Sequence, residues 1–126
     1  MAYLIDSDIL IDISRETPQA IEYVDSLPSE WMISQVTAME LIVGARDKRE
    51  LADLDVFLAA QLITPLSERI GTRAYELLKC YSKSHGLHVF DSLIAATAIE
   101  EGLTLVTRNK KHFHMIDGLS VEFPGY

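Results

Sequence analysis

Short, continuous apolar runs separated by stretches with helical spacing constrain the fold of this chain more than any other feature. Such runs occupy Tyr3–Ile5, Trp31–Ile33 and Leu103–Val106, and two more strands are predicted at Leu62–Thr64 and Leu119–Phe123. Apolar runs without alternation are typical of strands that are buried on both faces, as in a parallel sheet. Together with the helical segments between them, they predict an α/β sandwich with a mainly parallel sheet. In such sheets, ligands bind beyond the carboxyl ends of the strands.

The segments between these runs carry the start and stop signals of helices. Helices are predicted to begin at or near Asp6, Pro18, Ser34 or Thr37, residue 49, Ser67 and Asp91. Gly44 lies near the end of the third of these helices, and Gly102 is the predicted C-cap of the last one. The last helix runs from Asp91 to about Glu101, and its apolar composition predicts burial on most of its sides.

Composition predicts one compact domain over residues 1–126, because the chain has 126 residues and 48% of them are hydrophobic. No apolar run approaches the ~20 residues that span a bilayer, so no association with a membrane is expected. The N-terminus also lacks the basic and apolar regions of a signal peptide. Cys80 is the single cysteine, which excludes an internal disulfide and a cysteine-based zinc site. We therefore expect a reduced, cytoplasmic protein.

The formal net charge of −8 argues against a protein that holds nucleic acid by general electrostatic attraction. A nuclease is still compatible with this charge, because site carboxylates contribute to it and bound metal ions offset them locally. The acidic excess also suits association with a basic partner segment, but on charge alone solubility is the simpler explanation.

Three carboxylates that lie far apart in the sequence are candidates for one site. Asp6 follows the first predicted strand, Glu40 lies beside apolar residues of a predicted helix, and Asp91 begins the most apolar helix. If a parallel sheet brings them together, they form an oxygen-rich pocket that suits Mg²⁺ or Mn²⁺. Asn109 follows another strand closely, so it points to the same rim.

Each of these acids also has a structural explanation. Asp6 or Asp8 can cap a helix, but one cap needs only one of them, and two acids there repel each other without a cation. Glu40 forms a capping box with Thr37 if the helix begins at Thr37, whereas an inward-facing Glu40 needs a partner. Asp91 is either a helix cap or a metal-bound carboxylate at the N-terminus of a buried helix.

A basic cluster surrounds Asn109. Its members are Arg108, Lys110, Lys111, His112 and His114. Such a cluster suits a phosphodiester substrate beside an acidic metal site, and it is equally typical of a solvated loop. Because His88, His112 and His114 lack the spacing of a zinc motif, no zinc is predicted.

Four segments, taken in order, resemble those of the PIN-domain ribonucleases, and most of all the VapC toxins of toxin–antitoxin pairs. They are Leu4–Ile11, Thr37–Gly44, Asp91–Ala98 and Leu105–Phe113. Each motif alone is weakly specific, but four in order, with fitting spacing, form a specific signal that covers essentially the whole chain. The resemblance implies a three-layer α/β/α sandwich whose parallel sheet has about five strands.

The resemblance also implies a reaction and a set of catalytic residues. Asp6, Glu40 and Asp91 would hold one or two Mg²⁺ or Mn²⁺ ions, with Asn109 at the fourth catalytic position. A metal-activated water would attack an RNA phosphodiester in line, with no covalent enzyme intermediate.

Further roles and partners follow from the same resemblance. Asp8 would be an accessory ligand and Thr107 would support the site by hydrogen bonding, while Arg108 is a candidate for substrate binding. Relatives of this kind form homodimers, and a VapB-like antitoxin holds them inactive by laying its C-terminal segment across the site. The acidic net charge of this chain agrees with a basic antitoxin tail.

The chain departs from the family pattern at a few positions. Ser7 and Asp8 stand where many relatives have Thr and Asn, and both changes are mild. Many relatives carry an additional Asp near the position where this chain offers Asn109 and His112. A neutral amide binds metal more weakly than a carboxylate. This departure therefore argues against a second metal ion, and it does not affect the prediction of the first.

Two rival interpretations use the same residues. Asp6-Ser-Asp8 also resembles the first motif of haloacid-dehalogenase-type phosphatases, in which Asp6 would form an aspartyl-phosphate. That family has Thr or Val where this chain has Leu10. The other rival is a non-catalytic PIN-like module that keeps its acids for stability or partner binding. A metal-dependent gain in thermal stability separates a true metal site from independent helix caps.

Overall fold

The computed structural model describes residues 2–126 and contains a five-stranded sheet with the strand order β3-β2-β1-β4-β5. Every strand pairing in it is parallel. The strands are β1 (Tyr3–Ile5), β2 (Trp31–Ser34), β3 (Ile63–Thr64), β4 (Thr104–Val106) and β5 (Val121–Glu122). The predicted parallel sheet is confirmed, and β1 and β4 lie side by side at its centre although a hundred residues separate them.

Seven helices connect the described strands. They are α1 (Ser7–Ser14), α2 (Pro18–Asp25), α3 (Gln35–Val43), α4 (Lys48–Ala59), α5 (Glu68–His85), α6 (Val89–Glu100) and α7 (Lys110–Phe113). The short helix α7 was not predicted, because its basic residues resemble a charged loop. None of the helices formed by residues 2–126 has the length and the apolar character that a bilayer-spanning segment requires.

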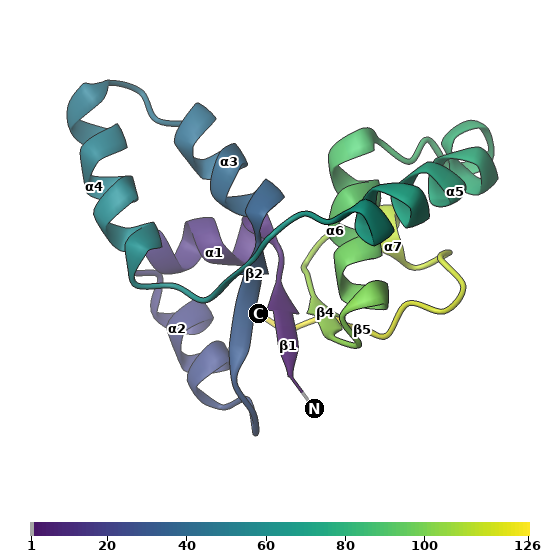
Figure 1. The fold of residues 1–126 in the computed structure, drawn as a ribbon. Coiled ribbons are helices and arrows are strands. Elements are labelled where there is room, and N and C mark those ends of the chain that lie inside the picture. The colour runs from purple at the N-terminus through teal and green to yellow at the C-terminus, as the bar shows by residue number, and fades with distance from the viewer. Residues whose placement is uncertain (1) are drawn as a thin grey trace.

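The helices form two layers around the sheet (Figure 1). Helices α1, α2 and α4 lie on one side, and α5, α6 and α7 lie on the other. Alternate residues of the central strands face opposite layers, as strand geometry requires. Leu4 and Leu105 pack in the core beneath α5 and α6, whereas Ile5 and Val106 pack in the core beneath α1. The two cores make the predicted α/β/α sandwich.

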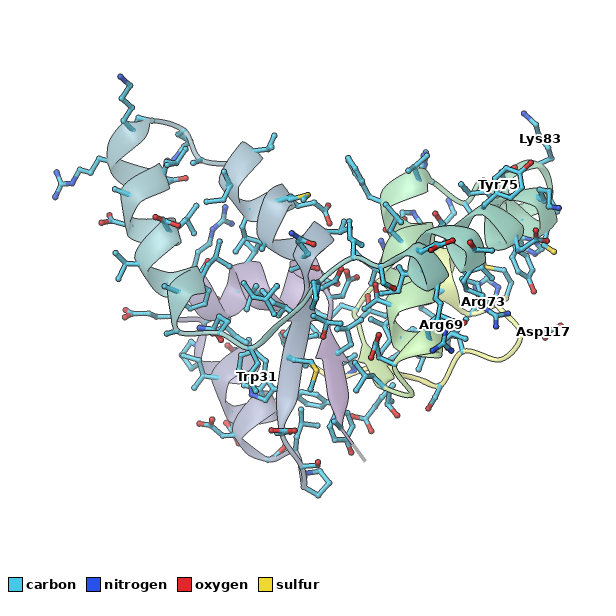
Figure 2. The ribbon with its side chains drawn as sticks, viewed as in Figure 1. Trp31, Arg69, Arg73, Tyr75, Lys83 and Asp117 are labelled. Carbon is cyan, nitrogen blue, oxygen red and sulfur yellow. The ribbon has the colours of Figure 1, made fainter. Side chains whose placement is uncertain are left out.

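Helices α5 and α6 pack against each other as a long antiparallel pair, joined by a tight turn at Gly86. Gly86 has a φ of 68°, a left-handed conformation that glycine adopts without strain. Two ion pairs brace the helices: Arg69 and Arg73 of α5 both contact Glu100 of α6, at 3.1 and 2.8 Å. Figure 2 shows both arginines beneath α5 and beside α6, whereas Tyr75 and Lys83 point away from this pair.

We predict that Leu105→Ala destabilises the fold strongly. Leu105 is fully buried in β4, and truncation of a buried leucine leaves a cavity that costs about 2–5 kcal/mol. Urea unfolding measures the loss. Val56→Ala on α4 is the control, since Val56 is 75% exposed and its truncation changes stability by less than about 0.5 kcal/mol. Equal effects in the two variants would contradict the observed core.

Candidate active site

The parallel strands β1 and β4 end side by side, which brings Asp6 and Thr107 into contact at the carboxyl edge of the sheet. The backbone N–H of Asp6 donates to the carbonyl of Val106 at 2.9 Å. Thr107 Oγ1 donates to Asp6 Oδ2 at 2.7 Å. The other carboxylate oxygen accepts the N–H of Ser7, so Asp6 also caps α1. Asp6 is therefore both a helix cap and a buried acid, with only 5% of its surface exposed.

Ser7 connects this strand end to α3. Its hydroxyl donates to Glu40 Oε1 at 2.8 Å and lies 3.2 Å from Thr37 Oγ1. The capping-box alternative for Glu40 is wrong, because Ser34 caps α3 by accepting the N–H of Val36. Since α3 starts at this earlier residue, Glu40 lies inside the helix and faces the site, where Ser7 is its hydrogen-bond partner.

Asp91 and Asn109 meet at a third residue, His112 of α7. His112 Nδ1 lies 2.8 Å from Asp91 Oδ2 and 2.9 Å from Asn109 Nδ2. Helix α6 begins at Val89, two residues earlier than predicted, and His88 is its N-cap. The prediction that Asp91 starts the helix is therefore wrong: Asp91 lies in the first turn, so the capping alternative does not account for it.

The loop from Thr107 to Asn109 joins these two groups of side chains. The N–H of Asn109 donates to Thr107 Oγ1 at 3.0 Å, and the same hydroxyl holds Asp6. The N–H of Arg108 donates to Asp8 Oδ2 at 2.9 Å. Asp6, Asp8, Thr107 and Asn109 are thus brought together by backbone and hydroxyl donors on one loop.

The side chain of Arg108 turns toward α1 and the C-terminal segment. Its Nη1 lies 3.5 Å from Asp12 Oδ2, and its guanidinium carbon lies 4.5 Å from the ring centre of Tyr126. The Tyr126 hydroxyl donates to the same Asp12 oxygen at 3.3 Å. The predicted substrate-binding residue therefore lies beside the acidic cluster, with 45% of its side chain exposed.

Burial and neighbouring negative charges raise the pKa values of Asp6, Asp8 and Glu40. Burial and then the negative charge of Asp8 raise the pKa of Asp6 to about 7, although the hydrogen bonds from Thr107 and Ser7 oppose the shift. Burial also raises the pKa of Asp8 and of Glu40. The charge of Asp91 contributes to the raised pKa of both Asp6 and Glu40. The three predicted acids are therefore electrostatically coupled, although three different elements carry them.

Comparison with known proteins identifies the family. Residues 3–119 match the PIN domain. The chain therefore belongs to the PIN domain family. The ribonuclease VapC19 of Mycobacterium tuberculosis is 37% identical over 120 residues, which are 92% of this chain and 95% of that protein. Family membership favours the nuclease interpretation of Asp6 over the phosphatase alternative.

Two solved structures share the fold of this PIN domain. A chain of a toxin–antitoxin complex from Klebsiella pneumoniae is 32% identical and superposes with a TM-score of 0.76, covering 93% of this chain and 94% of that one. A chain of the Rickettsia felis VapBC2 complex, bound to a promoter DNA fragment, is 26% identical with a TM-score of 0.83, covering 98% and 99%. Both alignments extend over nearly the full length of the chain.

The donor chemistry of this PIN domain fits a hard divalent cation, although the side chains are not closed around one. Within residues 2–126, no three His, Cys, Asp or Glu side chains are grouped so that they could hold a metal ion as they stand. Asp91 instead contacts His112, and Glu40 accepts from Ser7. Carboxylates that raise one another's pKa values are nevertheless the groups whose repulsion a cation relieves.

Sequence reasoning did not include two of the residues that the structure places in this site. Ser7 stands between two candidate acids, and its hydroxyl is the link to Glu40. His112 was considered in the basic cluster, as a zinc ligand and beside Asn109 near the fourth catalytic position, but not as the partner of Asp91, which it contacts directly. For His112, its spacing of three residues from Asn109 was the available signal, because a single turn of helix brings such residues together.

We predict that Asp6→Asn stabilises the metal-free protein at high pH. The pKa of Asp6 is about 7 in the folded chain and 3.8 ordinarily. The folded state therefore binds this proton more tightly, and stability falls as the pH rises from about 4 to about 7. Asparagine still caps the helix but carries no charge. The variant's free energy of unfolding therefore exceeds that of wild type by on the order of 2 kcal/mol at about pH 8, and the difference vanishes near pH 4.

Unfolding by urea at a series of pH values in EDTA measures this difference. Asp117→Asn is the matched control, because Asp117 is exposed and its backbone N–H donates to Tyr81 of α5, while Figure 2 shows its side chain at the outer edge of the molecule. A stability difference between Asp6→Asn and wild type that stayed constant from pH 4 to pH 8 would contradict a buried, proton-binding Asp6.

Proposed function

We propose that this chain is a metal-dependent endoribonuclease and the toxin of a VapBC-type toxin–antitoxin pair, folded as a single domain over residues 1–126. The observation that carries the proposal is the position of Asp6 at the carboxyl edge of a parallel sheet, with Glu40 joined to it through Ser7 and with the charge of Asp91 acting on both. Burial and the charge of Asp91 raise the pKa of both Asp6 and Glu40, which supports a cation site. Membership of the PIN domain family and similarity to the ribonuclease VapC19 support cleavage of RNA.

Asp6, Glu40 and Asp91 would hold Mg²⁺ or Mn²⁺, with Asn109 at the fourth catalytic position. The chemistry that a bound cation supplies is activation of a water molecule and stabilisation of the leaving oxygen of a phosphodiester. The chain itself orients the ligands: Thr107 fixes one oxygen of Asp6 and Ser7 fixes one oxygen of Glu40.

Asp8 has an accessory role in this proposal. Its carboxylate holds the backbone of Arg108, which keeps the loop carrying Thr107 and Asn109 against the acids. Arg108 would contact a substrate phosphate next to the scissile one. A cavity of about 330 Å³ between α1, α3 and α4 adjoins Glu40, and Arg15 and Arg46 line it together with Glu50 and Asp53. Arg46 is paired with Glu50 at 2.8 Å, which leaves Arg15 to offset the acidic lining where a polyanion approaches.

The partners in this proposal are RNA, a cognate VapB-like antitoxin and a second copy of the chain. The toxin–antitoxin complex from Klebsiella pneumoniae supports an antitoxin partner, and the acidic site suits a basic antitoxin segment laid across it. An RNA substrate and the free, exposed thiol of Cys80 suit a cytoplasmic protein.

We predict that Asp91→Asn removes cleavage of RNA and leaves the fold intact. Loss of a metal ligand lowers activity by at least about 100-fold, since even mutation of a residue that only hydrogen-bonds to a ligand lowers metal affinity or activity about 10- to 100-fold. The experiment compares total RNA incubated with purified wild type and variant, in Mn²⁺ and in EDTA. Circular dichroism and thermal unfolding confirm that the variant folds.

The matched control is Asp117→Asn, which removes the same charge away from the site and retains full activity. Cleavage by Asp91→Asn at the wild-type rate would overturn the assignment of the site. A wild type that gains thermal stability from Mn²⁺ but cuts no RNA would point to the non-catalytic module.

An exposed apolar groove supports the homodimer. It has a volume of about 490 Å³ and lies between α3, α4 and β3. The apolar residues that line it are Ala38, Met39, Ile42, Val43, Leu58, Ala59 and Ile63. Met39 is 50% and Val43 is 84% exposed. Apolar surface of this kind, gathered in one place, is typical of protein–protein contacts.

We predict that Val43→Asp converts a dimer into a monomer. Burial of a charge at a self-complementary contact disfavours association on both copies at once. Light scattering after size-exclusion chromatography measures the mass of the species. Val56→Asp is the control, because Val56 is 75% exposed on α4 but does not line the groove. A monomeric wild type would exclude the dimer, and a dimeric Val43→Asp variant would exclude this groove.

A further inference from the structure

Two aromatic side chains that follow β5 lie against the two cations that flank Asn109. The guanidinium carbon of Arg108 is 4.5 Å from the ring centre of Tyr126, and Lys110 Nζ is 5.7 Å from the ring centre of Phe123. Both distances fit cation–π contacts, in which the face of a ring attracts a positive charge. The segment after β5 therefore supports the cation on each side of Asn109.

The pairing of β4 with β5 places this segment beside the loop. The two strands are parallel neighbours, and the N–H of Thr107 donates to the carbonyl of Glu122 at 3.2 Å. Tyr126 is further anchored on two helices: its hydroxyl donates to Asp12 of α1 at 3.3 Å, and its ring centre lies 6.3 Å from that of Tyr23 of α2. The sheet and two helices thus fix the position of the Tyr126 ring.

An aromatic support leaves the charge of a cation available to a ligand. A carboxylate offsets the charge of the cation that it pairs with, whereas a ring attracts the cation without carrying a net charge. Lys110 has no carboxylate within ion-pair distance among residues 2–126. In the same part of the chain, Asp12 is the one carboxylate paired with the Arg108 guanidinium, and this contact is long, at 3.5 Å. Both cationic side chains are exposed, so an anion from solvent can reach them.

We propose that Tyr126 and Phe123 are positioning residues, which hold Arg108 and Lys110 as a clamp for two phosphates of single-stranded RNA. The inference rests on the proposed nuclease function and adds to it two residues outside the acidic site. Cations that follow the backbone, combined with aromatic side chains, are typical of proteins that bind single-stranded nucleic acid. Because Asn109 lies between the two cations in the sequence, the clamp directs the RNA backbone across the carboxyl edge of the sheet.

Fluorescence anisotropy tests the clamp, with a labelled single-stranded oligouridine titrated with protein in EDTA at several salt concentrations. EDTA removes the cation on which the proposed cleavage depends, so binding is measured apart from catalysis. Tyr126→Leu and Phe123→Leu each remove a ring and leave the cation in place. We expect each to raise the dissociation constant about threefold, the loss of one exposed cation–π contact. The slope of log affinity against log salt falls in magnitude by up to about 0.7, which corresponds to one phosphate of a single strand.

Two further variants separate positioning from a general structural effect. Tyr126→Phe keeps the ring at Arg108 and loses only the hydroxyl, so it binds oligouridine as wild type does. Tyr75→Leu is the matched control, because Lys79 Nζ lies 5.1 Å from the ring centre of Tyr75 and Figure 2 shows Tyr75 on α5, apart from the sheet. Loss of that ring leaves the dissociation constant unchanged. Circular dichroism confirms that each variant folds.

A double-mutant cycle shows whether Tyr126 acts through Arg108. In Arg108→Gln the phosphate contact is already lost, so the further change Tyr126→Leu has no effect on oligouridine binding. An equal loss of affinity from Tyr126→Leu in both backgrounds would overturn the inference. The same cycle with Lys110→Gln tests Phe123, and it decides the matter if Tyr126→Leu does not fold.

The outcomes also distinguish this inference from the proposed function. Ring-dependent binding of oligouridine, in a protein that cuts no RNA, would support the clamp and overturn the nuclease. Cleavage of RNA by a protein whose oligouridine affinity is the same in wild type, Tyr126→Leu and Phe123→Leu would overturn the clamp and leave the nuclease intact. A wild type that does not bind oligouridine would overturn the clamp as well.

Discussion

The burial of the Asp6 carboxylate at the end of a central strand is the constraint on which the site depends. A buried carboxylate costs free energy unless donors surround it, and two donors contact the carboxylate of Asp6. The first turn of α1 donates one N–H, and Thr107, the residue that follows the neighbouring strand β4, donates another hydrogen bond through its hydroxyl. These two hydrogen bonds only partly offset the effect of burial, so the pKa of Asp6 is still raised to about 7. The site is therefore held in a state that a positive charge would stabilise further.

Small hydroxyl side chains transmit this constraint to the rest of the site. The Thr107 hydroxyl donates to Asp6 and accepts the N–H of Asn109. These two bonds fix the loop after β4 to the end of β1. Ser7 reaches Glu40 on α3 in the same way. Because each link is short and neutral, it fixes a carboxylate without neutralising it. This division of roles keeps the acids available to a cation, while the donors set their orientation.

The sequence predicted the elements well and the local contacts less well. The apolar runs at Tyr3–Ile5 and Leu103–Val106 placed two central strands correctly, because burial on both faces leaves a continuous apolar signal. The start of α6 was misplaced by two residues, since His88 caps it without a side-chain hydrogen bond that a preferred capping residue would signal. The predicted capping box between Thr37 and Glu40 does not form, because Ser34 caps the helix three residues earlier.

The sequence alone determined the α/β architecture and pointed to Asp6 and Asn109, because periodicity and strand-end position are local properties of the chain. Asp91 was named for its place at the start of an apolar helix, and Glu40 mainly through the resemblance to the family. Only the tertiary structure decided how these residues meet. The pairing of β1 with β4 brings together residues a hundred positions apart, and the packing of α7 beside α6 brings His112 to Asp91. Contacts of this kind depend on the strand order and on how helices pack, which no local pattern in the sequence encodes.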